Sequence, residues 1–176
     1  MSSSKLASAL VVSCLASAAG AQAPAPRDSA APPLTFGVGG GFAMHSPLRP
    51  TTPTDGLGYT ATAQLELRTA LRPLLLRGEG SLARWSNGER VSSLTAALVA
   101  RPTARWRVLP YAVGGGGIYF PQGAGSAPGW TLGAGLQLPA GTRALFLESR
   151  LHAMSVGTGI ERWRYTYSPL TLGIRF

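Results

Sequence analysis

The strongest structural signal in the chain lies at its C-terminal end. Leu170, Leu172, Ile174 and Phe176 occupy every second position and alternate with small or polar residues. Because successive side chains of a β-strand point to opposite faces, these four residues form one apolar stripe. The segment is therefore predicted to be a strand whose apolar face is covered, either by a protein core or by lipid.

This ending resembles the C-terminal strand of bacterial outer-membrane β-barrels, which closes on an aromatic residue that the assembly machinery reads. In this chain the aromatic residue is Phe176. The resemblance implies a location in the bacterial outer membrane. It also implies that the barrel-assembly machinery is a partner through the C-terminal strand.

The N-terminal segment 1–21 has the pattern of a signal peptide. Lys5 precedes an apolar stretch over 6–19, and the small residues Ala19 and Ala21 fit a cleavage site. A lipoprotein alternative exists, since the residues before Cys14 loosely fit a lipobox. Otherwise Cys14 is removed with the signal, so the mature chain has neither a disulfide nor a cysteine-based metal site.

The mature chain is expected to hold one domain after a linker. Segment 22–33 is rich in proline and alanine and has no apolar periodicity, which indicates a periplasmic linker. Segment 34–176 is then the barrel domain. No later stretch reaches the ~18 consecutive apolar residues of a membrane helix.

The charge balance is basic, but it does not indicate nucleic-acid binding. Without Lys5, 15 of the 16 basic residues remain against 7 acidic ones, a net charge of +8. All 15 are arginines, and they do not cluster into a stripe. For an exported chain the nearer polyanion is the layer of lipid headgroups, so lipopolysaccharide and other outer-membrane lipid are the expected partners.

Alternation and turn signals predict eight strands and an all-β, antiparallel, up-and-down transmembrane β-barrel. Each predicted strand is long enough to cross a membrane at a tilt, which takes ~9–11 residues. The short connections lie at 72–73, 102–104 and 140–142, the long ones at 47–56, 121–128 and 155–162, and 87–89 is a short exception. The predicted strands are 34–46, 57–71, 74–86, 90–101, 105–120, 129–139, 143–154 and 163–176.

The polar face of these strands favours a membrane barrel over a soluble one. Alternation alone also fits a soluble, lipocalin-like barrel with its apolar residues inside. The polar face, however, carries few charges, as a narrow lumen requires when every charge must be paired. The predicted lumen charges are Glu66, Arg68, Arg77, Glu79, Glu148, Arg150 and Arg175.

The turn at 72–73 predicts how two of these strands pair. Leu71 is expected opposite Leu74, which sets Arg68 opposite Arg77 and Glu66 opposite Glu79. Oppositely charged residues then meet along the diagonals. Eight strands leave an interior that side chains fill, so we expect a plugged lumen and not a diffusion pore.

Aromatic residues gather near the ends of the predicted strands, as in the girdles at membrane interfaces. The expected interface aromatics are Tyr59, Trp85, Trp106, Tyr119, Trp130, Trp163 and Phe176. A second group of residues at the loop ends could bind lipopolysaccharide phosphates through guanidinium groups, with ordinary solvated charge as the alternative. Its members are Arg49, Arg84, Arg90, Arg162 and Arg164.

The C-terminal half carries a broader resemblance. The stretches PYAVGGGGIY at 110–119, LGAG at 132–135, LFLESRLH at 145–152 and PLTLGIRF at 169–176 are similar to the outer-membrane β-barrel domain of the opacity-protein type. The resemblance implies an eight-stranded barrel in the outer membrane. It does not imply one shared activity.

The sequence offers one weak candidate for catalysis. His152, Glu148 and Ser155 are the residue types of a hydrolase, and some small outer-membrane barrels modify lipid A. In a regular strand His152 and Ser155 point to opposite faces, and only a bulge near Gly157 would bring them together. His45 has no acidic neighbour in sequence, so it is not expected to be a metal ligand. No metal site and no cofactor are predicted.

We therefore expect a non-enzymatic, monomeric barrel that displays loops outside the cell for envelope structure, adhesion or lipid interaction. A membrane-embedded lipid A hydrolase and a secreted soluble barrel that binds an apolar ligand are the alternatives.

Overall fold

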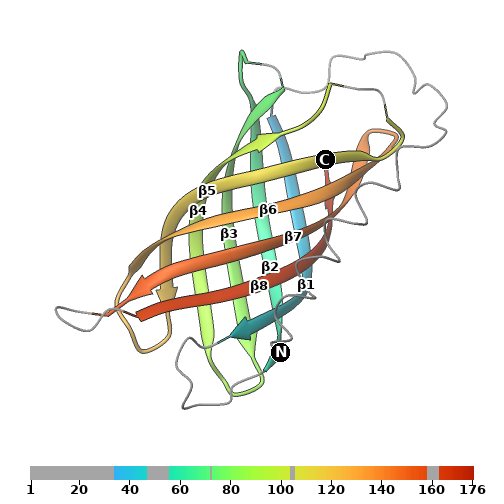
Figure 1. Cartoon of the computed structure of the whole chain (residues 1–176). Helices are drawn as coiled ribbons and strands as arrows, with labels where there is room; N and C mark the ends of the chain where they lie inside the picture. Colours follow the sequence, from blue (N-terminus) through green and yellow to red (C-terminus); the bar gives the residue numbers. More distant parts are fainter. Residues whose placement is uncertain (1–33, 47–55, 72, 104–105, 158–162) are drawn as a thin grey trace, which may run out of the picture.

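The computed structural model describes residues 34–46, 56–71, 73–103, 106–157 and 163–176. It is a closed barrel in which every strand pairs antiparallel with its neighbours in sequence, and the last strand closes on the first (Figure 1). Among these residues no helix has the length and hydrophobicity of a membrane span. The strands are β1 (Leu34–Ser46), β2 (Leu57–Arg68), β3 (Leu74–Trp85), β4 (Arg90–Ala100), β5 (Leu109–Pro121), β6 (Ala127–Ala140), β7 (Arg143–Val156) and β8 (Trp163–Arg175).

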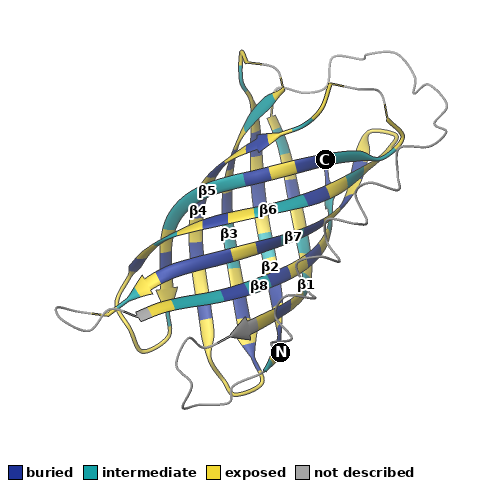
Figure 2. Ribbon diagram, in the orientation of Figure 1, coloured by how far each residue is buried: buried dark blue, intermediate teal, exposed yellow. Residues whose placement is uncertain are grey.

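Buried and exposed residues alternate along most of the barrel wall (Figure 2), and most of the large aliphatic side chains lie on the exposed face. Leu94 and Leu132 are 63% and 60% exposed, whereas the charged side chain of Arg77 in the interior is fully buried. In water this distribution would expose the apolar surface and bury the charges, which is unfavourable on both counts. The outer wall therefore faces lipid, and the soluble-barrel alternative is excluded.

The two ends of the barrel differ in their connections. One end, the turn end, has the connections 69–73, 101–108 and 141–142. The other, the loop end, has 47–56, 86–89, 122–126 and 157–162. The first 33 residues lie outside the described part of the chain, so the signal peptide and the linker stay predictions.

The connection between β4 and β5 differs from the expected tight turn at 102–104. β4 ends at Ala100 and β5 begins only at Leu109, so Trp106 lies in the connection and not in a strand. Pro102 has no N–H to give to a sheet ladder, which ends the strand at this point. The last residue of β4, Ala100, pairs with Ala112 of β5. The residues of β5 before Ala112 therefore pair with β6 alone.

The pairing of β2 with β3 is shifted by two residues from the predicted register. Arg68 lies opposite Leu75, and Glu66 lies opposite Arg77, where the turn at 72–73 predicted Leu71 opposite Leu74. The Thr69 hydroxyl lies 3.0 Å from the carbonyl oxygen of Leu71 and 2.8 Å from that of Leu74, which stabilises a wider turn. A shift of two keeps every side chain on its predicted face.

The barrel closes where β8 meets β1. Phe176 N–H donates to the carbonyl oxygen of Phe36 (2.8 Å), and the two rings stack on the outer wall with centroids 6.5 Å apart. On the inner wall the ring of Phe146 lies against Gly173, where a Cβ would collide with it and with the Val38 carbonyl. Glycine is therefore needed at this position.

Candidate functional site

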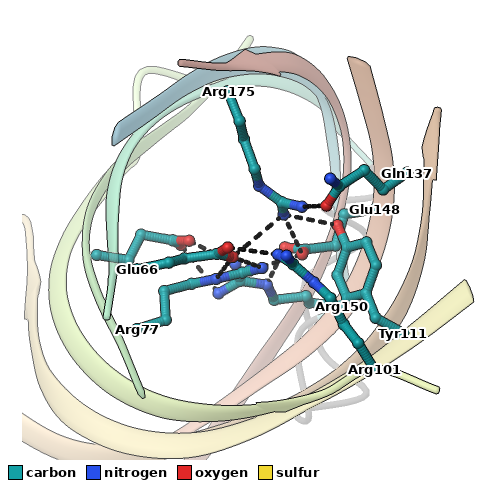
Figure 3. A network of polar contacts seen from close by, with 9 residues as sticks. Glu66, Arg77, Arg101, Tyr111, Gln137, Glu148, Arg150 and Arg175 are labelled. Carbon is teal, nitrogen blue, oxygen red and sulfur yellow. Dashed lines mark hydrogen bonds and ion pairs between the residues drawn. The ribbon is translucent and has the colours of Figure 1, made fainter. Parts of the chain in front are cut away.

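The turn-side half of the lumen is occupied by a network of buried charges centred on Arg77 (Figure 3). Its guanidinium donates to Glu66 of β2 through Nε (2.9 Å) and Nη2 (2.6 Å), and to Glu148 of β7 through Nη1 (2.6 Å). Glu66 is the cross-strand partner of Arg77, whereas Glu148 reaches it from the opposite wall. Arg77 thus ties two sides of the barrel together.

A second guanidinium, that of Arg150 on β7, continues the network toward the loop end. It forms a bidentate pair with Glu79 of β3, with one bond at 2.9 Å, and its Nε also donates to Glu148. Glu148 therefore bridges Arg77 and Arg150. Bidentate pairs of this kind are among the strongest hydrogen bonds in proteins.

Two further arginines enter from the turn end. Arg175 donates to the Gln137 side-chain oxygen (2.6 Å) and to the Tyr111 hydroxyl (3.0 Å), and its Nη2 lies 3.5 Å from Glu66. Arg101 pairs with Glu66 from the connection after β4. The Tyr111 ring lies beneath the guanidiniums of Arg77, Arg101 and Arg175, at 4.9–5.7 Å, which adds cation–π attraction.

The structure brings together six of the seven predicted lumen charges and leaves out Arg68. Arg68 is the last residue of β2 and lies exposed at the rim, because the strand ends there. Arg101 takes part instead, as do the uncharged Tyr111 and Gln137. Strand parity could have identified all three, since Arg101 continues the inward series of Val99, and the other two share a face with inward residues of their strands.

The loop-side half of the lumen is filled by aromatic and apolar side chains. His152 stacks on Tyr167 with ring centroids 4.6 Å apart, and its Nδ1 lies 3.0 Å from the Tyr119 hydroxyl. Trp85 packs edge-on against Tyr167 at 5.6 Å. Between this layer and the charged layer, a small cavity next to Glu79 and His152 has room for about one water molecule.

Two of the expected interface aromatics are placed wrongly by the sequence-based prediction. Trp85 and Tyr119 are buried in the lumen, on the same inward faces as Ala83 and Gly117. The sequence shows that both residues lie near strand ends. Whether a side chain points inward or outward, however, depends on its odd or even position relative to its neighbours in the strand. Tyr59, Trp106, Trp130 and Phe176 are exposed, and the side chain of Trp163 lies outside the described residues.

The structure does not bring the candidate hydrolase residues together. His152 is buried in the lumen, whereas Ser155 is exposed, and the pairing of β7 with β8 keeps one register on both sides of the histidine. The side chain of His45 lies outside the described part of the chain. Among the described residues no group of histidine, cysteine and carboxylate side chains could hold a metal ion.

Comparison with known proteins identifies the fold. No protein-family model and no curated protein matches the sequence. Among solved structures, Neisserial surface protein A is similar at a TM-score of 0.68 and 12% identity, over 82% of this chain and 96% of that one. The outer membrane enzyme PagL is similar at a TM-score of 0.56 and 13% identity, over 81% and 98%.

At these identities the likeness establishes the fold alone. Together with the inverted arrangement of apolar and charged side chains, it makes this chain an eight-stranded transmembrane β-barrel of the bacterial outer-membrane type. The predicted fold class and location are thereby confirmed. A surface protein and an enzyme share this fold, so function has to be argued from the side chains.

Proposed function

We propose that the protein is a non-enzymatic, monomeric outer-membrane barrel that acts through its loops and its outer wall, in envelope structure, adhesion or lipid interaction. The observation that carries the proposal is the filled lumen. A charged layer and an aromatic layer occupy it in series, from Arg175 at the turn end to Trp85 at the loop end. Such an interior supports rigidity and leaves no path for a solute.

The orientation follows from the connections. In bacterial barrels the short turns face the periplasm and the longer loops face outward. The loop end would then carry the surface that meets the exterior. Its described arginines, Arg84, Arg90 and Arg164, are exposed, which supports contact with the phosphates of lipopolysaccharide.

The alternative of a lipid A hydrolase can be tested directly. His152 is enclosed by Tyr119 and Tyr167, and Ser155 lies on the other face of β7, which argues against a nucleophile and base in this pair. Mass spectrometry of lipid A from cells with and without the protein should show identical acylation. A loss of acyl chains that requires His152 would establish an enzyme.

The binding role of the loops calls for a capture experiment. The folded barrel is immobilised and exposed to solubilised envelope or host-surface components, beside a variant with connections 47–56 and 122–126 shortened to tight turns. A component held by the full barrel and lost by the variant supports display by the loops. Equal capture by both would remove the loops as the binding surface.

A further inference from the structure

The outer wall over β2–β5 carries a groove in an otherwise leucine-rich surface. Two adjoining hollows share Ala63, Gly80 and Leu94 and so form one depression, which we name the lipid-side groove. Larger outward side chains, including Leu65, Ile118 and Phe120, flank it. Its floor consists of small residues, namely Ala61, Ala63, Gly78, Gly80, Ala96 and Gly116.

Packing within the barrel does not require the two glycines of β3. A Cβ at Gly78 would meet no atom within 4 Å, and one at Gly80 would make only ordinary contact with Leu94 at 3.7 Å. Gly117 of β5 is different, because a Cβ there would collide with the backbone of β4. Since glycine weakens a strand, the open space at Gly78 and Gly80 points to something outside the protein.

Two arginines stand at the loop-side mouth of this groove. Arg84 of β3 and Arg90 of β4 are direct cross-strand partners, both exposed and on the same outward face as the groove. Neither forms an ion pair with a described residue. Like charges directly opposite each other are unfavourable, so an anion between the two guanidiniums would stabilise this edge of the sheet.

The distance between the arginines and the floor of the groove matches one leaflet of a membrane. From Arg84 to Gly78 the strand advances six residues, about 20 Å at ~3.3 Å per residue. With the usual tilt of ~40° this spans a depth of about 15 Å, half of the ~30 Å hydrocarbon core. An anion at the mouth and an apolar chain in the groove would thus belong to one lipid.

We propose that Arg84, Arg90 and the lipid-side groove bind one molecule of lipopolysaccharide. A phosphate lies between the two guanidiniums, and one acyl chain lies along Gly80 and Gly78. The choice of lipopolysaccharide rests on the proposed function, which places the loop end at the outer leaflet. Guanidinium groups match phosphate oxygens bidentately, whereas the small floor residues admit a chain close to the sheet.

The test measures lipid binding to the folded barrel in detergent by native mass spectrometry, with three probes. These are purified lipopolysaccharide, the same lipid after dephosphorylation, and phosphatidylglycerol. The wild type should bind one lipopolysaccharide more tightly than either other lipid. Arg84→Gln with Arg90→Gln should weaken its binding about tenfold or more, and Gly78→Leu with Gly80→Leu, which fills the groove, should also weaken it.

Matched variants separate the site from general charge and bulk. Arg68→Gln with Arg143→Gln removes the same charge from exposed positions at the turn end, and Ala112→Leu adds apolar bulk outside the groove. Both should bind lipopolysaccharide as the wild type does. Heat-dependent migration on gels verifies that each variant is folded.

Three outcomes would overturn the assignment. The arginine variant could bind lipopolysaccharide as tightly as the wild type does, or the wild type could bind the dephosphorylated lipid or phosphatidylglycerol as tightly as lipopolysaccharide. All variants keep the loops, so capture of a loop partner can succeed while this site fails. Recovery of the protein outside the outer membrane would instead remove both proposals.

Discussion

Glu66 and Arg77 face each other directly across β2 and β3, and two nitrogens of the guanidinium share one carboxylate oxygen at 2.6 and 2.9 Å. The remaining terminal nitrogen of Arg77 reaches Glu148 on the far wall at 2.6 Å. One side chain therefore connects β2, β3 and β7 through the interior. Its removal tests how far the network stabilises the barrel.

Arg77→Ala should destabilise the folded barrel by about 3–5 kcal/mol, because it leaves two buried carboxylates short of a partner. Urea unfolding of the protein in lipid vesicles measures the change. Arg68→Ala is the matched control, since this arginine is exposed at the rim, and it should change stability by less than about 0.5 kcal/mol. Equal effects of the two substitutions would contradict the network.

Deletion of Phe176 should lower the yield of assembled barrel much more than Phe146→Ala does. Phe176 lies on the outer wall against Phe36, where the assembly machinery can reach it, whereas Phe146 is enclosed in the lumen. The readout is the heat-modifiable fraction in isolated outer membranes. Similar yields for the two variants would show that the final aromatic residue is not an assembly signal.

The wild-type barrel should not form stable channels in planar lipid bilayers. The guanidinium groups of Arg77, Arg150 and Arg175 cross the lumen, and their partners hold them in place. Recordings over a range of voltages should show no steady conductance of the size that passes sugars. Reproducible channels of that size would mean that the charged layer opens in a membrane.

Gly173→Ala should impair assembly or lower the free energy of unfolding by about 1–3 kcal/mol, the usual cost of overpacking. The added Cβ would collide with the Phe146 ring and the Val38 carbonyl oxygen, and the backbone atom cannot move away without disturbing the β1–β8 pairing. Gly78→Ala is the control, because a Cβ there enters open space. A folded Gly173→Ala barrel of wild-type stability would contradict this packing.

The sequence by itself determined the fold class, the strand count and the face of most side chains. The period of two along each strand is a local property, and it puts Leu132 outside and Glu148 inside whatever the neighbouring strands do. The same rule would have turned Trp85 and Tyr119 inward, had parity been weighed above their position near strand ends. Alternation does not show which face of the sheet meets water. The small number of charges on the polar face was needed to predict that this face lines the lumen.

Only the tertiary structure decided which charges meet. The wider turn around Thr69 moved the β2–β3 register by two residues, which replaced Glu79 with Arg77 as the direct partner of Glu66. The contact between Arg77 and Glu148 joins residues 71 positions apart, and it depends on the curvature that closes eight strands into one barrel. Register and closure are set by turns and by all strands together, and no local pattern in the chain encodes them.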